Sequence, residues 1–146
     1  MRCLVIVKAS EESEAGVLPD EQFVREMMRY NEELVKAGVL LTAEGLYPSS
    51  KGKRVRFAGG KTTVIDGPFT ETKELIAGFW LWQVASMDEA IAWVKRCPKP
   101  ADAAQREGVI EIRPLFEASD FCAQISPAAQ AQEEHFRAEL EKQKKA

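Results

Sequence analysis

The sequence predicts an α+β fold in which strands of one antiparallel sheet are covered by two helices. Short apolar, β-branched segments alternate with segments of helical spacing, in the order strand, helix, strand, hairpin, strand, helix, strand. The chain has 146 residues, 45% hydrophobic and 29% charged, which is enough for one ordinary globular domain and a tail. The order of elements is the split β-α-β, or ferredoxin-like, plan with an inserted hairpin.

The first elements follow from local signals. Residues 2–9 are short, apolar and β-branched and predict a strand, and residues 10–18 predict a polar loop. Pro19 and Asp20 predict a helix start with the proline in the first turn, and Gly38 predicts its end. Residues 39–46 predict the second strand. The positions with helical spacing between these signals are Phe23, Val24, Met27, Met28, Asn31, Leu34 and Val35.

The second half of the domain follows in the same way. Residues 47–53 predict a loop, and residues 54–57 and 62–65 predict a hairpin around Gly59 and Gly60. The aromatic segment 78–85 predicts a strand, and Ser86 with Glu89 forms a capping-box pattern before a helix that stops ahead of Pro98. A loop to Gly108 then leads to the last strand, residues 109–115.

The composition changes after about residue 116, which predicts a domain of residues 1–116 and a helical tail of residues 117–146. Pro127 predicts the start of a last helix. Its apolar content is thin, with Phe136 and Leu140 at i, i+4, so the helix is not expected to be stable alone.

Both faces of the central strands are apolar. A sheet with helices on one side alternates apolar and polar residues, yet Leu4 and Ile6 lie between Cys3, Val5 and Val7. Trp80 and Trp82 likewise alternate with Phe79 and Leu81. Two helices cover one face, and the simplest cover for the other is the same face of a second copy. The sequence therefore predicts a homodimer through the sheet face, a dimeric α+β barrel with a C-terminal helical extension.

Residues 66–74 are the most distinctive segment, because they gather a turn, ionisable side chains and a helix-start signal directly after the strand of residues 62–65. One interpretation makes Asp66 a general acid or base in a cleft between subunits. The other makes it a cap for its own turn. Both remain open at this point.

Further candidates are polar residues close to this segment or within apolar strands. Thr70, Glu71, Thr72 and Lys73 either bind an anionic small molecule at a helix N-terminus or cap that helix, and Glu71 can lie close to Asp66. Four charges lie at or in apolar strands and are predicted either to pair or to form a polar lining of the cleft: Lys8, Glu44, Glu111 and Arg113. For Glu111 and Arg113 an ion pair is favoured, and Lys8 and Glu44 are the candidate ligand-binding residues. Trp80 and Trp82 are interpreted as anchors of the dimer interface rather than as a ligand wall.

Other classes of function are disfavoured. A net charge of −3 and the lack of a basic–aromatic pattern disfavour nucleic-acid binding, and no apolar run approaches the roughly 20 residues of a membrane span. Cys3, Cys97 and Cys122 form no C-x-x-C pair, which favours a reducing, cytoplasmic setting. His135 and Glu139 alone are too few for a metal site, and no phosphate-binding glycine loop is present, so neither metal nor cofactor is expected.

Residues 64–74 (VIDGPFTETKE) resemble the signature of the YCII-related, or DGPF-domain, proteins. Residues 37–46, 78–81, 88–90 and 110–114 resemble the same family. The resemblance covers roughly residues 1–116 and implies an α+β barrel that dimerises through its sheet. Most members have no characterised role, and some are encoded near, or fused to, extracytoplasmic-function sigma factors. A related branch carries a histidine–aspartate pair proposed as catalytic, but the single histidine here, His135, lies outside the matching region, so only Asp66 matches.

Three hypotheses of function remain. The first is a non-enzymatic or regulatory protein that binds a small molecule near Asp66 in a homodimer. The second is a small cofactor-free enzyme in which Asp66 moves a proton on a small polar or aromatic substrate. The third is an interaction partner in a sigma-factor-linked system, acting through the C-terminal helix.

Overall fold

A computed structural model describes residues 1–100, 106–121 and 123–146 of the chain. These residues form two compact units, Met1–Pro114 and Leu115–Ala146. The sequence predicts its division two residues later, and whether the two parts are separate domains stays a prediction. Residues 101–105 of the predicted loop, and Cys122, lie outside the described residues.

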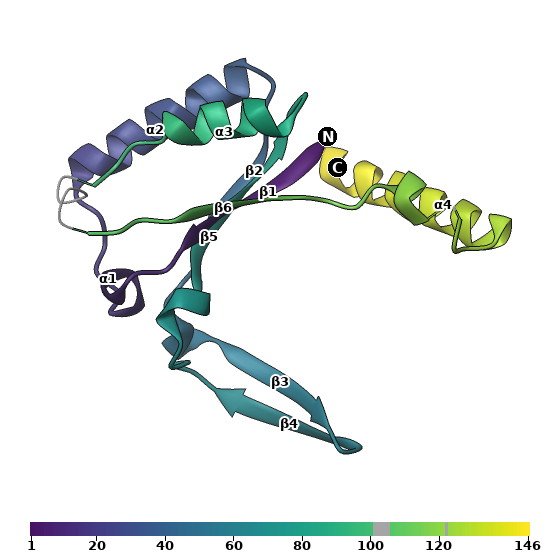
Figure 1. The fold of residues 1–146 in the computed structure, drawn as a ribbon, viewed down its shortest axis with the longest axis horizontal. Helices are drawn as coiled ribbons and strands as arrows, with labels where there is room; N and C mark the ends of the chain where they lie inside the picture. Colours follow the sequence, from purple (N-terminus) through teal and green to yellow (C-terminus); the bar gives the residue numbers. More distant parts are fainter. Residues whose placement is uncertain (101–105, 122) are drawn as a thin grey trace. The chain divides into compact units, whose positions relative to one another are not determined.

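Four strands of the first unit form an antiparallel sheet in the order β2-β5-β1-β6. They are β1 (Arg2–Lys8), β2 (Leu40–Gly45), β5 (Ile76–Gln83) and β6 (Ile110–Pro114). α2 (Glu21–Lys36) joins β1 to β2, and α3 (Met87–Lys95) joins β5 to β6. Figure 1 shows the two helices side by side on one side of the sheet. This arrangement confirms the predicted α+β, ferredoxin-like fold.

The boundaries of α2 are set by a carboxylate and a glycine. Asp20 is the N-cap and accepts a hydrogen bond from the Phe23 amide at 2.8 Å. The sequence predicts Pro19 in the first turn of the helix, but Pro19 instead precedes the N-cap. Gly38 follows the helix with a φ of +71°, a conformation that favours glycine.

α3 begins at a capping box that closes one residue earlier than the usual pattern. The Ser86 hydroxyl accepts a hydrogen bond from the Glu89 amide at 3.2 Å, as predicted. The Glu89 carboxylate accepts from the Ala85 amide at 2.6 Å, so the reciprocal bond reaches the residue before the N-cap. α3 ends at Lys95, ahead of Pro98.

The core lies between the sheet and the two helices. Tyr30 of α2 packs edge-on against Trp80 of β5 and Trp93 of α3, and its hydroxyl donates a hydrogen bond to the Trp93 carbonyl at 2.8 Å. The Trp80 indole N–H donates to Asn31 Oδ1 at 2.9 Å, which explains a polar residue on the apolar stripe of α2. The buried residues of this core are Cys3, Val5, Tyr30, Leu34, Val39, Trp80, Trp82, Val84, Ala90 and Cys97.

The two tryptophans of β5 correct an expectation. Trp80 and Trp82 were expected to anchor a dimer interface, but both are buried beneath the helices of their own chain. Strand alternation permitted either assignment, because Phe79 and Leu81 between them are equally apolar.

β3 (Lys53–Ala58) and β4 (Lys61–Asp66) form a separate two-stranded ribbon, which confirms the predicted hairpin. Gly59 and Gly60 take φ values of +58° and +72° at its turn. In Figure 1 the hairpin extends away from α2 and α3.

Three short turns differ from what the sequence predicts at their positions. α1 (Glu11–Glu14) forms within the predicted loop of residues 10–18, because Ser10 and Ser13 bond each other's backbone amides. η1 (Ser49–Lys51) forms in the loop before β3. η2 (Thr72–Glu74) is a single 3-10 turn at the point where the sequence signalled a helix start.

The second unit consists of η3 (Ala118–Phe121) and α4 (Pro127–Lys145). Ser126 caps α4 by accepting from the Ala129 amide at 3.3 Å, which confirms the predicted start. No residue of α4 is buried, and ion pairs along its surface join Glu133 to Arg137 and Glu139 to Lys142.

Candidate functional site

The sheet face opposite α2 and α3 presents two rows of side chains that cross all four strands. Along β1 and β5 the core residues alternate with residues of this other face. Strand register gives the first row as Thr42, Leu81, Leu4 and Arg113. It gives the second row as Glu44, Phe79, Ile6 and Glu111. These eight residues are called the open face below.

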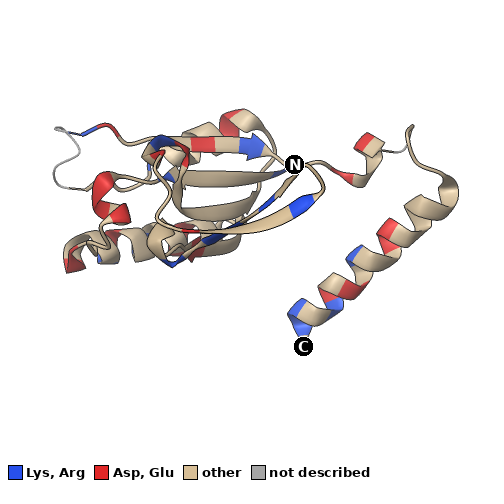
Figure 2. Ribbon diagram, turned by 90° about the horizontal axis from the view of Figure 1, so that it is seen from below, with Lys and Arg blue, Asp and Glu red and all other residues tan. Residues whose placement is uncertain are grey.

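The open face is apolar at its centre and polar at its borders. Phe79 and Leu81 on β5 lie beside Ile6 and Leu4 on β1, and three of the four are only half-buried. The ends of the rows are Thr42 and Glu44 on β2 and Glu111 and Arg113 on β6. Figure 2 shows the charged residues of β6 beside central strands that carry no charge along their middle. The face therefore suits a molecule with an apolar body and polar ends.

The charges on β6 are exposed and loosely paired. Arg113 Nε lies 3.8 Å from Glu111 Oε1, and the Arg113 side chain is 72% exposed. An exposed pair of this kind contributes little to stability, so both groups keep most of their capacity to bind other partners. The sequence left open whether Glu111 and Arg113 form a pair or line a cleft, and the geometry is compatible with both roles.

The two predicted ligand-binding residues in strands lie at different places. Glu44 belongs to the open face beside Phe79. Lys8 lies at the end of β1, after a register shift between Val7 and Lys8, and is half-buried. The structure thus brings Glu44 together with Glu111 and Arg113 on one face, and places Lys8 beyond the second row.

Asp66 lies at the base of the hairpin. Its carboxylate accepts a hydrogen bond from the Lys53 ammonium at 2.6 Å, and the Asp66 side chain is 73% exposed. Lys53 and Asp66 are also cross-strand partners in the ribbon. Asp66 thus closes the hairpin in the single chain, and its partner is Lys53 rather than Glu71.

Gly67 and Phe69 tie the hairpin base to distant parts of the first unit. A Cβ on Gly67 would lie 1.7 Å from the Ser49 carbonyl oxygen, so only glycine fits there. The Phe69 amide donates to Ser49 Oγ at 3.0 Å, and Ser49 Oγ donates to the Glu14 carboxylate at 2.5 Å. The Arg54 guanidinium lies 3.8 Å from the centre of the Phe69 ring. Together these contacts form the hairpin junction.

The polar residues after the junction lack the helix that the anion-binding hypothesis assumed. Thr72 and Lys73 lie in η2, a three-residue turn whose N-cap residue, Glu71, makes no side-chain cap. Thr70, Glu71 and Lys73 are exposed, and Thr72 is half-buried. Capping of a helix by a threonine, the alternative to anion binding, is also absent at this turn. Ligand binding by these four residues stays a prediction.

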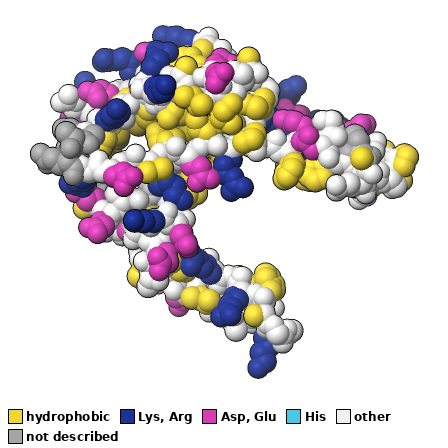
Figure 3. All heavy atoms as spheres, in the orientation of Figure 1, with side chains coloured by type: hydrophobic (Ala, Val, Ile, Leu, Met, Phe, Trp, Pro, Cys, Tyr) yellow, Lys and Arg dark blue, Asp and Glu magenta, His cyan; other side chains and the backbone are white. Residues whose placement is uncertain are grey.

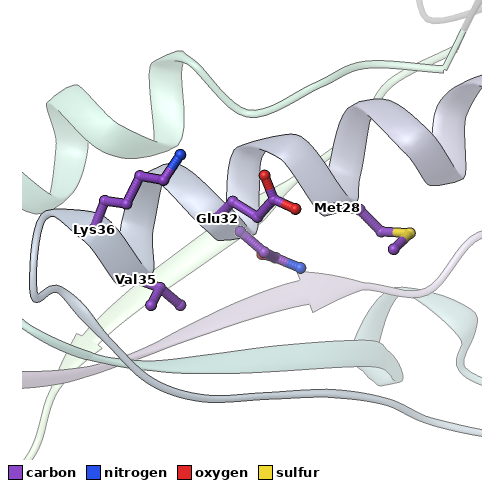
Figure 4. Close-up of a pocket in the computed structure, with 5 residues that line it drawn as sticks. Met28, Glu32, Val35 and Lys36 are labelled. Atoms are coloured by element: carbon purple, nitrogen blue, oxygen red, sulfur yellow. The ribbon is translucent and has the colours of Figure 1, made fainter.

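Two surface hollows lie along α2, on the helix side of the sheet. One, of about 370 Å³, is lined by Met28, Asn31, Glu32, Val35 and Lys36. Figure 4 shows Met28 and Val35 on one side of α2 with Glu32 between them. The other, of about 490 Å³, is lined by charged and polar residues of the first half of α2. Neither hollow is lined by Asp66, Glu71 or a residue of the open face.

The remaining ionisable groups give no second site. Within residues 1–100, 106–121 and 123–146, no group of His, Cys, Asp and Glu side chains is arranged to hold a metal ion. Burial raises the pKa of the Cys3 thiol and raises that of Cys97 to about 11, which keeps both thiols neutral and unreactive. Desolvation also raises the pKa of the Tyr30 phenol. None of the helices in the described part of the chain combines the length and apolar character that crossing a membrane demands.

Sequence reasoning missed several residues that the fold brings together. Thr42 enters the open face only through strand register, because a bulge between Leu40 and Thr42 shifts the alternation. Glu14 and Ser49 are 35 residues apart, and nothing in either local sequence indicates that they meet. The Ser10-x-x-Ser13 pattern was a usable signal for the turn that carries Glu14.

Comparisons with known proteins identify a family and two similar proteins. The family model described as "YCII-related domain" matches residues 1–119. An uncharacterised protein of Rhizobium meliloti (strain 1021) is 36% identical over 96 residues, which cover 66% of this chain and 75% of that protein. A solved structure, 5-chloro-2-hydroxyhydroquinone dehydrochlorinase from Burkholderia phenoliruptrix AC1100 in complex with 2,5-dihydroxybenzoquinone, matches with a TM-score of 0.43 and 15% identity. That match covers 82% of this chain and 98% of the dehydrochlorinase.

Proposed function

We propose a function from the premise that the chain belongs to the YCII-related family. The protein binds a small molecule in a homodimer, in a site formed on the open face of the sheet. The observation that carries this proposal is the pair of rows that cross four strands, apolar at the centre and polar at both ends. The role is binding without catalysis, in a regulatory setting.

A second copy is the simplest cover for the open face. α2 and α3 already occupy the other face, and the central residues Leu4, Phe79 and Leu81 remain half-buried. Burial of apolar surface contributes about 25 cal/mol per Å², so covering these side chains favours association. An isologous pair would bring two identical open faces together and enclose a space between their charged borders.

The chemistry of the rows indicates the class of ligand. Phe79 and its apolar neighbours favour a flat or compact apolar body. Arg113 favours a carboxylate or another anionic group at one end, and Glu44 or Glu111 favours a hydroxyl or an amine that donates a hydrogen bond. A small aromatic or aliphatic acid with a second polar group meets these demands.

The alternative with Asp66 as a proton shuttle finds less support. A proton shuttle has to be held against the reacting group of a substrate, in a cleft that excludes water. Asp66 is instead exposed and paired with Lys53. The sigma-factor alternative acts through α4, and no contact in the second unit points to a particular protein partner.

A thermal-shift screen tests the proposal with a library of hydroxylated benzoates and short dicarboxylates. We expect at least one compound to raise the Tm of the wild type and not that of Arg113→Gln. Arg29→Gln, at an exposed position on α2, is the matched control and should respond as the wild type does. A compound that stabilises Arg113→Gln but not Asp66→Asn would move the site to the hairpin junction. A library without any stabilising compound, or a monomer by light scattering at micromolar concentration, would contradict the proposal.

A further inference from the structure

The β3–β4 hairpin has two chemically different faces. Because cross-strand partners share a face, Val55 and Val64 lie together with Phe57 and Thr62 on one side. This side is called the apolar face of the hairpin. The opposite side carries the basic residues Arg54, Arg56 and Lys61 together with Ile65 and Thr63. Figure 3 shows hydrophobic and basic side chains along the hairpin.

The apolar face of the hairpin is uncovered in the single chain. Every residue of β3 and β4 is exposed, including Phe57 at 78%, Val64 at 65% and Val55 at 52%. A two-stranded ribbon that packs on nothing is at best marginally stable in water. Contiguous exposed apolar side chains on such a ribbon mark an interaction surface.

The base of the hairpin is held in place. Gly67 fits against the Ser49 carbonyl, and its amide donates a hydrogen bond to the Gly52 carbonyl at 3.1 Å. The Phe69 amide is hydrogen-bonded to the Ser49 hydroxyl. The Arg54 guanidinium stacks on Phe69. The direction of the hairpin is therefore set by the junction, although nothing covers its length.

The charge of the hairpin is opposite to that of the rest of the chain. Residues 53–66 contain four Lys or Arg residues and one acid, a net charge of +3. Since the whole chain carries −3, the remaining residues carry −6. A second copy of this chain therefore offers an acidic surface to the hairpin, including Glu44 and Glu111 at the borders of its open face.

We propose that the β3–β4 hairpin is an arm that packs its apolar face on the second copy of this chain and contributes residues to the border of that copy's ligand site. This inference rests on the proposed function, because it requires the homodimer. The apolar side chains bury against the border of the partner's open face, beside the central residues that the two sheets cover in the dimer. The basic side chains on the opposite side of the hairpin add a longer-range attraction to the acidic second copy. The junction of residues 66–69 then serves to aim the arm.

Photo-crosslinking tests the contact directly. Phe57→p-benzoylphenylalanine places the probe on the apolar face, and Ala58→p-benzoylphenylalanine, one residue along on the opposite face, is the matched control. Mixing unlabelled and ¹⁵N-labelled copies separates cross-links between copies from those within one chain. We expect inter-copy cross-links from position 57 to peptides of β2 or β6, and at least several-fold fewer from position 58.

A second pair of variants measures the contribution of the apolar face to the dimer. Val64→Ser and Ile65→Ser change adjacent, exposed positions on opposite faces of β4. We expect Val64→Ser to weaken dimerisation roughly tenfold or more by sedimentation, and Ile65→Ser to leave it within about twofold.

The outcomes separate the arm from the proposed function. A dimer that yields only intra-chain cross-links and is unaffected by Val64→Ser would overturn the arm and leave the homodimer and its ligand site standing. A monomeric wild type would overturn both. A single-stranded DNA oligonucleotide that binds the wild type and binds Arg56→Ser more weakly, while the dimer is unchanged, would mean that the hairpin binds nucleic acid. The proposal would then fail.

Discussion

The two faces of the four-stranded sheet have similar composition and different surroundings. On β1 and β5, Cys3, Val5, Trp80 and Trp82 face α2 and α3 and are buried. The residues between them, Leu4, Ile6, Phe79 and Leu81, are just as apolar and face away from both helices. α2 and α3 cover only one of these faces. The function proposed above assigns a second copy and a ligand to the other face.

The largest expected effect comes from truncating one residue on each face. Trp82→Ala removes a side chain that is fully buried and should lower the free energy of unfolding by about 3–5 kcal/mol. Leu81→Ala, its neighbour on the open face, should lower it by about 1 kcal/mol in dilute solution. Urea denaturation monitored by tryptophan fluorescence measures both.

The same pair of variants also tests whether the open face is covered. If the dimer forms, the loss of stability in Leu81→Ala should grow as protein concentration rises. The loss of stability in Trp82→Ala should not change with concentration, because Trp82 does not lie on that face. Equal and large losses at every concentration would mean that Leu81 is already covered within its own chain.

The next effect concerns a thiol in the core beneath the helices. Burial raises the Cys97 pKa from 9.0 to about 11. The unfolded thiol ionises near pH 9 and the folded thiol two pH units higher, so the stabilisation is full below pH 9. It is lost between about pH 9 and pH 11, at about 1.4 kcal/mol per pH unit from this group.

Cys97→Ala isolates this contribution. Urea denaturation from about pH 8 to about pH 10.5 should show a shallower decline in stability for Cys97→Ala than for the wild type. Cys3 titrates in both proteins and cancels in the comparison. Identical slopes would mean that Cys97 is reached by water in the folded protein.

A smaller effect is expected at the polar contact inside the covered side. Asn31→Leu leaves the Trp80 indole N–H without its acceptor, which should cost about 1–2 kcal/mol in the free energy of unfolding. Asn31→Asp keeps an oxygen acceptor and should lose less. If both variants are as stable as the wild type, the hydrogen bond contributes nothing, and the polar residue on α2 needs another explanation.

The smallest effect on stability is expected at Asp66, which lies on neither face of the four-stranded sheet. Its pair with Lys53 is exposed, so Asp66→Asn should change the free energy of unfolding by about 0.5 kcal/mol or less. Thermal and urea denaturation measure this. A variant with normal stability that loses more than tenfold in ligand affinity would place the ligand at the hairpin junction rather than on the open face.

Much of the fold was predictable because each element carries its own local signal. Gly38 ends α2, Ser86 and Pro98 bracket α3, and Gly59-Gly60 turns the hairpin. The order of strands and helices then follows from the alternation of strand-like and helix-like spacing of apolar residues along the chain. α1 and η2 were missed because one turn of helix is too short to show a period.

The candidate site was predictable only in part. Glu44, Glu111 and Arg113 stood out as charges in apolar strands, and strand register places them on one face. Asp66 stood out as part of a distinctive segment, but its neighbours Lys53 and Gly52 are brought there by the ribbon and the preceding loop. Local sequence contains no information on such long-range contacts, because they depend on how strands pair.

The sequence by itself determined the elements, their order and the fact that the central strands are apolar on both sides, since these depend on local residue types and their spacing. The tertiary structure decided which side is covered. Trp80 and Trp82 lie under the helices, where Trp80 packs on Tyr30 and bonds Asn31 of α2, and Phe79 and Leu81 face away. It also decided that residues 66–69 hold the base of a hairpin, because Ser49, itself bonded to Glu14, reaches Gly67 and Phe69 only in the folded chain.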